Sequence, residues 1–350
     1  MDVETATLDE AVRRLRARAE AAPAGAWIQG SGWNHNVWGA GALPDRGPLD
    51  RAAPRNPVAL KAKSGHAIWA NGLALQAAGI HAGTADPPGG KIVRGAAGEP
   101  TGMLLENAMD LVQAAIPAPT TEQMADALLD AQSALHRVGL VGAYDYDSSL
   151  VLGALELLEQ RGQLSLRVVK GIPHELLSQA IALGLRTGFG GERLTIGAVK
   201  LFADGALGPQ TAWMLEPYEG GSSLGIPTLT EDLMFEDARR ANAAGIACAI
   251  HAIGDGACRA VLNAFERASG ELGHSAEARQ LRNRMEHAQL LSPDDLPRMA
   301  RLGVIASMQP IHATSDMLIA DRYWGDRCAG AYAWRSLLEA GTTLSFGSDC

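Results

Sequence analysis

A lysine, Lys200, interrupts an apolar, β-rich segment of the sequence, and Asp204 follows it closely. A central strand tolerates a cation poorly, so Lys200 stands either at the end of a strand or in a place where chemistry needs it. Two histidines, His251 and His287, and one carboxylate, Asp349, also follow apolar segments directly. Lysine, imidazole and carboxylate groups from four strand ends are the donor set of a metal site or of acid–base catalysis.

With a divalent metal such as zinc bound, this set of residues could catalyse hydrolysis. Amide and ester carbonyls are poor electrophiles, and water is a poor nucleophile near neutral pH. A bound metal polarises the carbonyl and lowers the pKa of its water toward ~7. A nearby carboxylate can then take the proton of the water and deliver it to the leaving nitrogen.

Structural explanations of the same residues stay open at this point. Lys200 could extend to solvent from a strand end, form a Schiff base with a carbonyl substrate, or carry a metal-bridging carbamate. Asp349 in Gly-Ser-Asp could cap a helix. A lone histidine at a strand end is more often structural, but His251 and His287 together favour a functional interpretation. Weaker candidates are Gln309, together with His312, at a further strand end.

The elements that must position these residues form a regular series after about residue 120. Helices are predicted over residues 120–137, 231–244, 293–302 and 334–340, and glycines end them at Gly139, Gly245, Gly303 and Gly341. A buried-looking strand follows each glycine, and residues 164–171, 194–202 and 283–289 supply three more. Seven strands that alternate with helices predict a parallel α/β sheet, and a TIM-like (β/α)8 barrel more than a doubly wound sheet.

The first third of the chain shows no such regularity. A capping box at residues 7–10 predicts a helix, and short strands are expected at 26–30 and 57–62. Residues 30–57 and 81–101 are rich in glycine, proline and aspartate, which predicts loops.

Composition limits the classes of partner and compartment. The 350 residues carry a net charge of -9 without a basic block, which argues against nucleic acid and an anionic membrane as partners. Four cysteines form no Cys-x-x-Cys pair, which is typical of a reducing compartment, so we expect a cytoplasmic protein. The sequence has no run of 18 apolar residues, which a membrane-spanning helix would need. It does not decide between a monomer and a homo-oligomer.

Several ordered motifs resemble one known family. These are VKLFADGALG at 199–208, HAIGDGA at 251–257, RMEHAQ at 284–289 and SFGSD at 345–349, with GHA at 65–67 and PPGG at 87–90 upstream. Together they resemble the amidohydrolase superfamily, family 3, the YtcJ-like metal-dependent hydrolases. The resemblance covers nearly the whole chain.

The resemblance implies one barrel domain over residues 1–350, with a family-specific insertion at about 25–115. It implies one or two divalent metals, usually zinc, and hydrolysis of a carbon–nitrogen bond that is not a peptide bond. Lys200 would be carboxylated and bridge the metals, His251 and His287 would hold one of them, and Asp349 would bind the other and act as general base. The substrate would be a small amide-type molecule, and we assign its binding to His66, Asp204 and Gln309.

The sequence departs from the family pattern at its ends. It contains no His-x-His, which should end the first barrel strand, and it stops one residue after Asp349. We therefore expect an incomplete barrel that lacks strand 1, the final helix and the small β-sandwich. Such a chain should bind metal weakly and hydrolyse little. A catalytically inactive fragment or a non-catalytic binding barrel, and a Schiff-base aldolase built on Lys200, are the alternatives.

Overall fold

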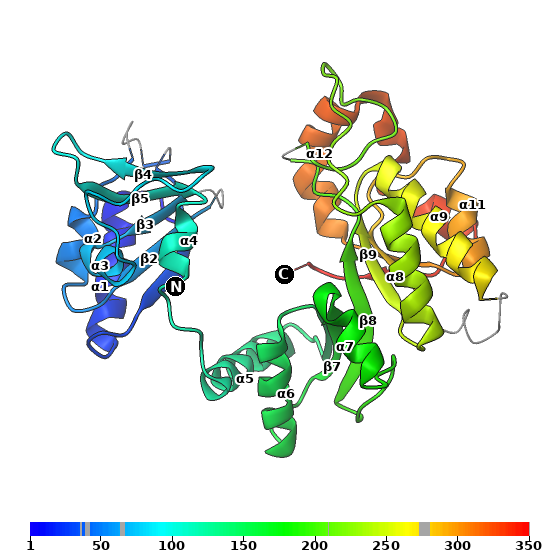
Figure 1. Ribbon diagram of the computed structural model, residues 1–350, viewed down its shortest axis with the longest axis horizontal. Coiled ribbons are helices and arrows are strands. Elements are labelled where there is room, and N and C mark those ends of the chain that lie inside the picture. Colours follow the sequence, from blue (N-terminus) through cyan, green and yellow to red (C-terminus); the bar gives the residue numbers. More distant parts are fainter. Residues whose placement is uncertain (36, 39–42, 64–66, 209, 273–280, 350) are drawn as a thin grey trace. The chain divides into compact units, whose positions relative to one another are not determined.

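The structure, a computed structural model, describes residues 1–35, 37–38, 43–63, 67–208, 210–272 and 281–349. It divides into two compact units, Met1–Ala118 and Pro119–Cys350 (Figure 1). None of the helices described is both long enough and apolar enough to cross a membrane. The assignment of the whole chain to one barrel domain with an insertion stays a prediction.

The first unit is built around a five-stranded mixed sheet. Its strand order is β1-β2-β3-β5-β4, with β1 parallel to β2 and the other neighbours antiparallel. The elements are α1 (Leu8–Ala21), β1 (Ile28–Trp33), α2 (Gly47–Ala52), β2 (Val58–Ala62), β3 (Ala67–Ala70), α3 (Gly72–Ala77), β4 (Gly90–Arg94), β5 (Pro100–Glu106) and α4 (Met109–Gln113).

Both faces of this sheet are buried, because successive side chains of a strand point to opposite sides. In β3, Trp69 packs into one core cluster with Leu15 of α1, while Ile68 packs into the other with Leu75 of α3. The unit therefore has two apolar layers, one on each side of its sheet.

The second unit contains seven parallel strands that form one curled sheet. The strand order, β12-β11-β10-β9-β8-β7-β6, follows the chain without interruption. The strands are β6 (Gly142–Asp145), β7 (Arg167–Pro173), β8 (Leu194–Phe202), β9 (Cys248–Ala252), β10 (Arg284–His287), β11 (Ile305–Met308) and β12 (Leu344–Phe346). All seven predicted strands are thus confirmed, and so is their parallel arrangement.

Helices precede or connect these strands. They are α5 (Thr121–Arg137), α6 (Ser149–Gln160), η1 (His174–Leu176), α7 (Leu177–Ala182), α8 (Glu231–Ala243), α9 (Asp255–Glu271), α11 (Leu296–Leu302), α12 (Pro310–Trp324), η2 (Gly325–Gly330) and α13 (Trp334–Glu339), where η denotes a 3-10 helix. Helices α8, α9 and α11 lie along one side of the sheet (Figure 1), and the largest core cluster, which includes Leu201, Ile250 and Phe265, fills the space between.

Glycines end the helices as predicted. All four have a positive φ, between 69° and 87°, at positions 139, 245, 303 and 341. Gly303 is the left-handed C-cap of α11, a conformation that glycine adopts without a steric penalty. Each helix consequently stops there, and the chain turns back to begin the next strand.

One prediction for the first unit is confirmed and another was wrong. Residues 30–57 were expected to be mostly loop, and most of the described residues there lie outside helices and strands, although β1 extends to Trp33 and α2 occupies Gly47–Ala52. Residues 81–101 were expected to form a loop, but β4 lies within this stretch and β5 begins at its end. The glycine- and proline-rich sequence favours turns locally, and pairing with distant strands overrides that preference. The missing barrel parts stay a prediction.

Candidate metal centre

Parallel strands bring the predicted site residues to one edge of the sheet. In register, Phe202 at the end of β8 lies opposite His251 of β9, and Glu286 of β10 lies opposite His251 on its other side. His287 ends β10, and Asp349 follows β12 by three residues. The carboxyl ends of the strands thus carry the polar side chains, which is where barrel enzymes place their active sites.

His251 is partly buried among its neighbours. Its Nε2 lies 2.8 Å from the carbonyl oxygen of Gly205 and 3.4 Å from Oδ1 of Asp204, and its ring centroid is 4.5 Å from that of His287. Burial lowers the pKa of His251 to about 3, and the nearby charge of Lys200 contributes in the same direction. The ring is therefore neutral near pH 7. Because only its Nε2–H can donate to the Gly205 carbonyl, Nδ1 keeps the lone pair.

His287 is oriented by a glutamine. Its Nδ1 lies 2.8 Å from Oε1 of Gln309, whose amide nitrogen donates to the carbonyl of Ser307 at 3.3 Å. Nδ1 must then carry the proton, so Nε2 offers a lone pair. Burial is the main cause that lowers the pKa of His287, followed by the charge of Lys200. The backbone is left-handed at His287 and Ala288, with φ of 73° and 43°, which turns this ring out of the strand direction.

Lys200 lies between two aromatic rings. Its Nζ is 4.7 Å from the ring centroid of Phe202 and 5.0 Å from that of Tyr146. Burial lowers the pKa of Lys200, while the carboxylates of Glu286 and Asp349 oppose that shift. A lysine with a lowered pKa is more often a free amine, and the free amine is the form that reacts as a nucleophile.

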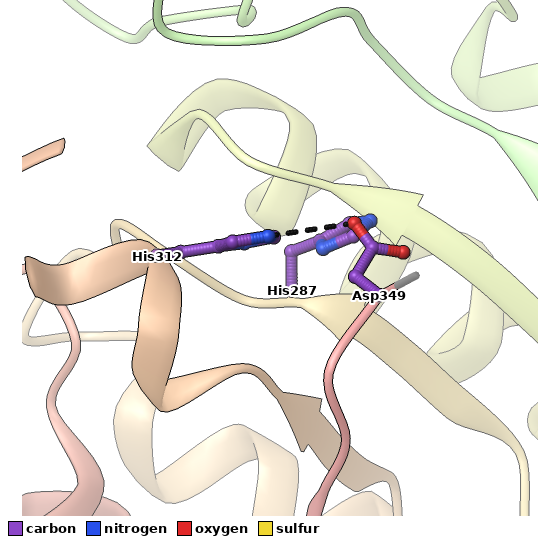
Figure 2. A group of neighbouring side chains, drawn as sticks. All are labelled: His287, His312 and Asp349. Carbon is purple, nitrogen blue, oxygen red and sulfur yellow. Dashed lines mark ion pairs between the residues drawn. The ribbon is translucent and has the colours of Figure 1, made fainter. Parts of the chain in front are cut away.

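His312 joins the site from α12. Its ring stacks on that of His287 with centroids 5.6 Å apart, and its Nε2 lies 3.5 Å from Oδ2 of Asp349. One ligand-type atom from each of His287, His312 and Asp349 falls within 4.8 Å of the others (Figure 2). The sequence marked His312 only as a weak candidate at a strand end, and the structure places it in the first turn of α12.

Asp204 is used by the backbone around it. Its side chain is fully buried and accepts hydrogen bonds from the amides of Trp213 at 2.8 Å, Ile253 at 3.1 Å and Gly254 at 2.9 Å. Burial raises the pKa of Asp204 to about 7, against the lowering effect of these amides. These contacts hold the turn after β9. Asp204 therefore positions His251. The predicted role of Asp204 in substrate binding stays a prediction.

The sequence analysis did not predict a polar network around Arg284 and Glu286 of β10. Glu286 pairs with Arg284 at 2.8 Å and accepts a hydrogen bond from the Tyr146 hydroxyl at 3.0 Å, and Arg284 donates to Ser307 at 2.5 Å. Arg284 also lies over the ring of Tyr144, 4.5 Å from its centroid. The signal was present in the sequence, because Arg284 and Glu286 are two residues apart on one strand and so share a face.

The other predicted site residues have mixed outcomes. His66 lies outside the described residues. Gln309 contacts His287, and its part in substrate binding stays a prediction. Lys200, His251, His287 and Asp349 lie at one edge of the sheet, and their roles as metal ligands, with Asp349 also as general base, stay predictions.

The donor chemistry of this edge fits a divalent cation. Neutral imidazoles and a carboxylate are groups that bind zinc and similar metals. Hydrogen bonds from the opposite ring nitrogens fix the rings of His251 and His287, as outer-shell partners do in metal sites.

Comparison with known proteins identifies the family. The model of the amidohydrolase family matches residues 2–350 of this chain. The chain belongs to the amidohydrolase family. It is 35% identical over 349 residues to the amidohydrolase YtcJ of Bacillus subtilis, covering 97% of this chain and 64% of YtcJ. It is 28% identical over 359 residues to an N-substituted formamide deformylase of Arthrobacter pascens, covering 98% and 65%.

Solved structures of metal-dependent hydrolases agree with the fold. A metal-dependent hydrolase from Pyrococcus furiosus matches with a TM-score of 0.80 at 29% identity, covering 99% of this chain and 68% of that one. A metal-dependent hydrolase from Pyrococcus horikoshii matches with a TM-score of 0.81, also at 29% identity, covering 99% and 66%. The chain spans just under two thirds of the length of the two curated relatives.

Proposed function

We propose that this amidohydrolase-family chain carries the active site of a metal-dependent hydrolase that cleaves carbon–nitrogen bonds of the non-peptide amide type. The observation that carries the proposal is the convergence of Lys200, His251, His287 and Asp349 at the carboxyl edge of one parallel sheet. The likeness to a formamide deformylase and to metal-dependent hydrolases supports the bond type and the metal.

The residues that would hold the metal, which we propose to be zinc, are His251 through Nδ1, His287 through Nε2, Asp349 and Lys200. Lys200 would do so as the carbamate that its free amine forms with dissolved carbon dioxide, with release of a proton. Bound there, a divalent cation supplies Lewis acidity, which polarises the scissile carbonyl and acidifies a water molecule. The two imidazoles need no deprotonation near neutral pH, because burial already keeps both in the neutral form.

Asp349 is the residue that moves the proton. Its carboxylate accepts a proton from the attacking water and passes it to the leaving nitrogen, so that the amine departs neutral. The products are a carboxylic acid and an amine, and one water is consumed. Gln309 and Gly205 have another role in this proposal, since each fixes the tautomer of a histidine.

The test uses the full chain, stripped of metal and then supplied with Zn²⁺, and an N-substituted formamide whose amine product is measured. We expect slow turnover, because the sequence contains no His-x-His pair, and we expect chelator to abolish it. We also expect H287N to lower the rate by at least the ~10- to 100-fold that loss of an outer-shell partner costs. The matched control is H81N, which changes an exposed histidine of the first unit.

Two results would contradict the proposal. One is zinc binding without turnover of any amide, which would favour a non-catalytic binding barrel. The other is turnover that chelator leaves unchanged while borohydride traps a carbonyl substrate on Lys200, which would favour an aldolase.

A further inference from the structure

We propose that His312 is a positioning residue that holds Asp349 through its Nε2–H group, and that it is not a metal ligand. The inference rests on the proposed function, because it assumes that Asp349 handles the proton of the attacking water. Proximity alone would suggest the opposite, since His287, His312 and Asp349 together have the composition of a three-residue metal site.

Gln289 decides which ring nitrogen of His312 carries the proton. The side-chain amide nitrogen of Gln289 lies 2.9 Å from Nδ1 of His312. An amide nitrogen can only donate, so Nδ1 of His312 must accept and must have no proton. A neutral imidazole with a bare Nδ1 carries its proton on Nε2, and that nitrogen has no lone pair to give to a metal.

The orientation of the Gln289 amide is supported by a count of buried groups. In the observed orientation its Oε1 is buried without a hydrogen-bond partner among the residues described. Rotating the amide by a half-turn would place the nitrogen, with two N–H donors, where that oxygen now lies. The observed orientation leaves one oxygen acceptor and one N–H group without an assigned partner, and the rotated one would leave two N–H groups, so rotation gains no hydrogen bond and would place the two donors at the buried position.

The N–H of His312 faces the carboxylate that it would hold. His312 Nε2 lies 3.5 Å from Oδ2 of Asp349, and the two side chains point toward each other (Figure 2). That distance is longer than a formed hydrogen bond, and such contacts in ligand-free sites often shorten when the reactants bind. Asp349 needs such support, because it follows the end of β12, has a left-handed backbone with φ of 60° and has a half-exposed side chain.

The two stacked rings therefore present opposite groups to the site. His287 donates from Nδ1 to Gln309 and offers a lone pair at Nε2, whereas His312 accepts at Nδ1 from Gln289 and offers a proton at Nε2. The first is the form of a ligand, and the second is the form of a hydrogen-bond donor. Two glutamines with opposite hydrogen-bonding roles thus separate two histidines that look equivalent in the sequence.

The direct test reads the tautomers by long-range ¹H–¹⁵N NMR of the full chain, without metal and then with added Zn²⁺. We expect His312 to be protonated on Nε2 in both states. The Nε2 signal of His287 should shift on zinc addition, and the ring signals of His312 should keep their pattern. A His312 protonated on Nδ1, or an Nε2 signal of His312 with the shift of a metal ligand, would overturn the inference.

Matched glutamine variants sharpen the test. Q289E replaces the donor to His312 by an acceptor, so it should move the His312 proton from Nε2 to Nδ1. Q309E keeps an acceptor for His287, so it should leave the His287 tautomer unchanged. Equal responses of the two rings to the two variants would contradict the assignment.

A third pair separates this inference from the proposed function. H312L removes the donor, and H312Q keeps an N–H at a similar reach. We expect both to bind zinc as the parent does, with kcat reduced about 10- to 100-fold in H312L and partly restored in H312Q. Loss of zinc in both variants would make His312 a ligand, and an unchanged kcat in H312L would remove its positioning role. If zinc does not bind even to the parent chain, the metal proposal fails, and the NMR tautomers still test His312.

Discussion

At the scale of single residues, burial shifts the pKa values of two neighbouring groups, His251 and Asp204, in opposite directions. His251 loses basicity because its cation is poorly solvated, so its pKa falls from 6.5 to about 3. Asp204 loses acidity because its anion is poorly solvated, so its pKa rises from 3.8 to about 7. Both groups are consequently neutral over much of the acidic range while they are folded.

These shifts predict pH slopes of opposite sign in the stability of the metal-free chain. Between pH 4 and 6.5 the unfolded chain binds a proton on His251 that the native chain lacks, so this residue makes the unfolding free energy rise with pH. Between pH 4 and 7 the native chain keeps a proton on Asp204 that the unfolded chain has lost, so this residue makes it fall with pH. Each contribution is limited to about 1.4 kcal/mol per pH unit.

Urea unfolding of the parent, H251N and D204N at several pH values between 4 and 7 measures both slopes. Relative to the parent, H251N should lose stability more steeply as pH rises, and D204N should gain stability as pH rises. Three parallel curves would show that neither residue titrates differently in the folded and unfolded chains.

The residues that follow strands could be predicted from the sequence, and their hydrogen-bond partners could not. Lys200, His251 and His287 are visible because each breaks or ends an apolar run. Gln289 and Gln309 become informative only when the contacts show which atom of each amide meets which ring. The sequence cannot show that α12 returns His312 to His287, since this depends on packing between distant segments.

At the scale of elements, the long connection between β8 and α8 supports the site through backbone contacts. Two parts of it pair with each other, as the amide of Met214 donates to the carbonyl of Leu224 at 2.8 Å and the amide of Ile226 donates to that of Thr211 at 3.1 Å. The same connection supplies the Trp213 amide to Asp204. We therefore expect a change that disturbs this pairing to shift the turn that orients His251.

Two glycines of this connection test its packing. Gly220 and Gly225 both have a left-handed backbone, with φ of 72° and 79°. A Cβ at Gly220 would meet nothing within 4 Å, whereas a Cβ at Gly225 would lie 1.9 Å from the carbonyl oxygen of Ala212. Alanine at either position costs about 1–2 kcal/mol for its backbone conformation. G225A should cost a further ~1–3 kcal/mol because the pairing must shift.

Denaturant unfolding of G220A and G225A gives this difference directly. The expected order of stability is parent, then G220A, then G225A. Equal losses for the two variants would mean that the connection yields without cost and does not hold the Asp204 turn in place.

The elements of the second unit could be predicted because the sequence repeats one signal, a helix, a glycine and an apolar strand. Strands β4 and β5 could not, because their neighbours are set by antiparallel pairing across the sheet. The segment before β4, with two prolines and two glycines, also indicates a loop on local grounds. Helix α2 was missed because it is only six residues long, too short to show a helical period.

At the scale of the whole molecule, each buried cluster found among the described residues lies within one unit. The clusters around Leu60 and Ile68 belong to Met1–Ala118, and those around Leu201, Leu158 and Trp324 belong to Pro119–Cys350. Cooperative unfolding follows shared cores, so each unit should unfold as its own cooperative block.

Calorimetry of two core variants tests that expectation. Leu60 and Leu201 are both fully buried, and leucine-to-alanine changes in such places cost about 2–5 kcal/mol. L60A should lower one thermal transition and L201A should lower the other. A single transition that both variants lower equally would show one cooperative body.

The central claim is that the carboxyl edge of the second sheet is a metal site, and a zinc titration tests it most directly. The metal-free full chain and its H251N, H287N and H81N variants are titrated with Zn²⁺ by calorimetry. Our account predicts that the parent and H81N bind zinc alike, and that H251N and H287N each raise Kd at least tenfold, about 1.4 kcal/mol. Equal zinc affinity in all four chains, or no zinc binding by the parent, would contradict it.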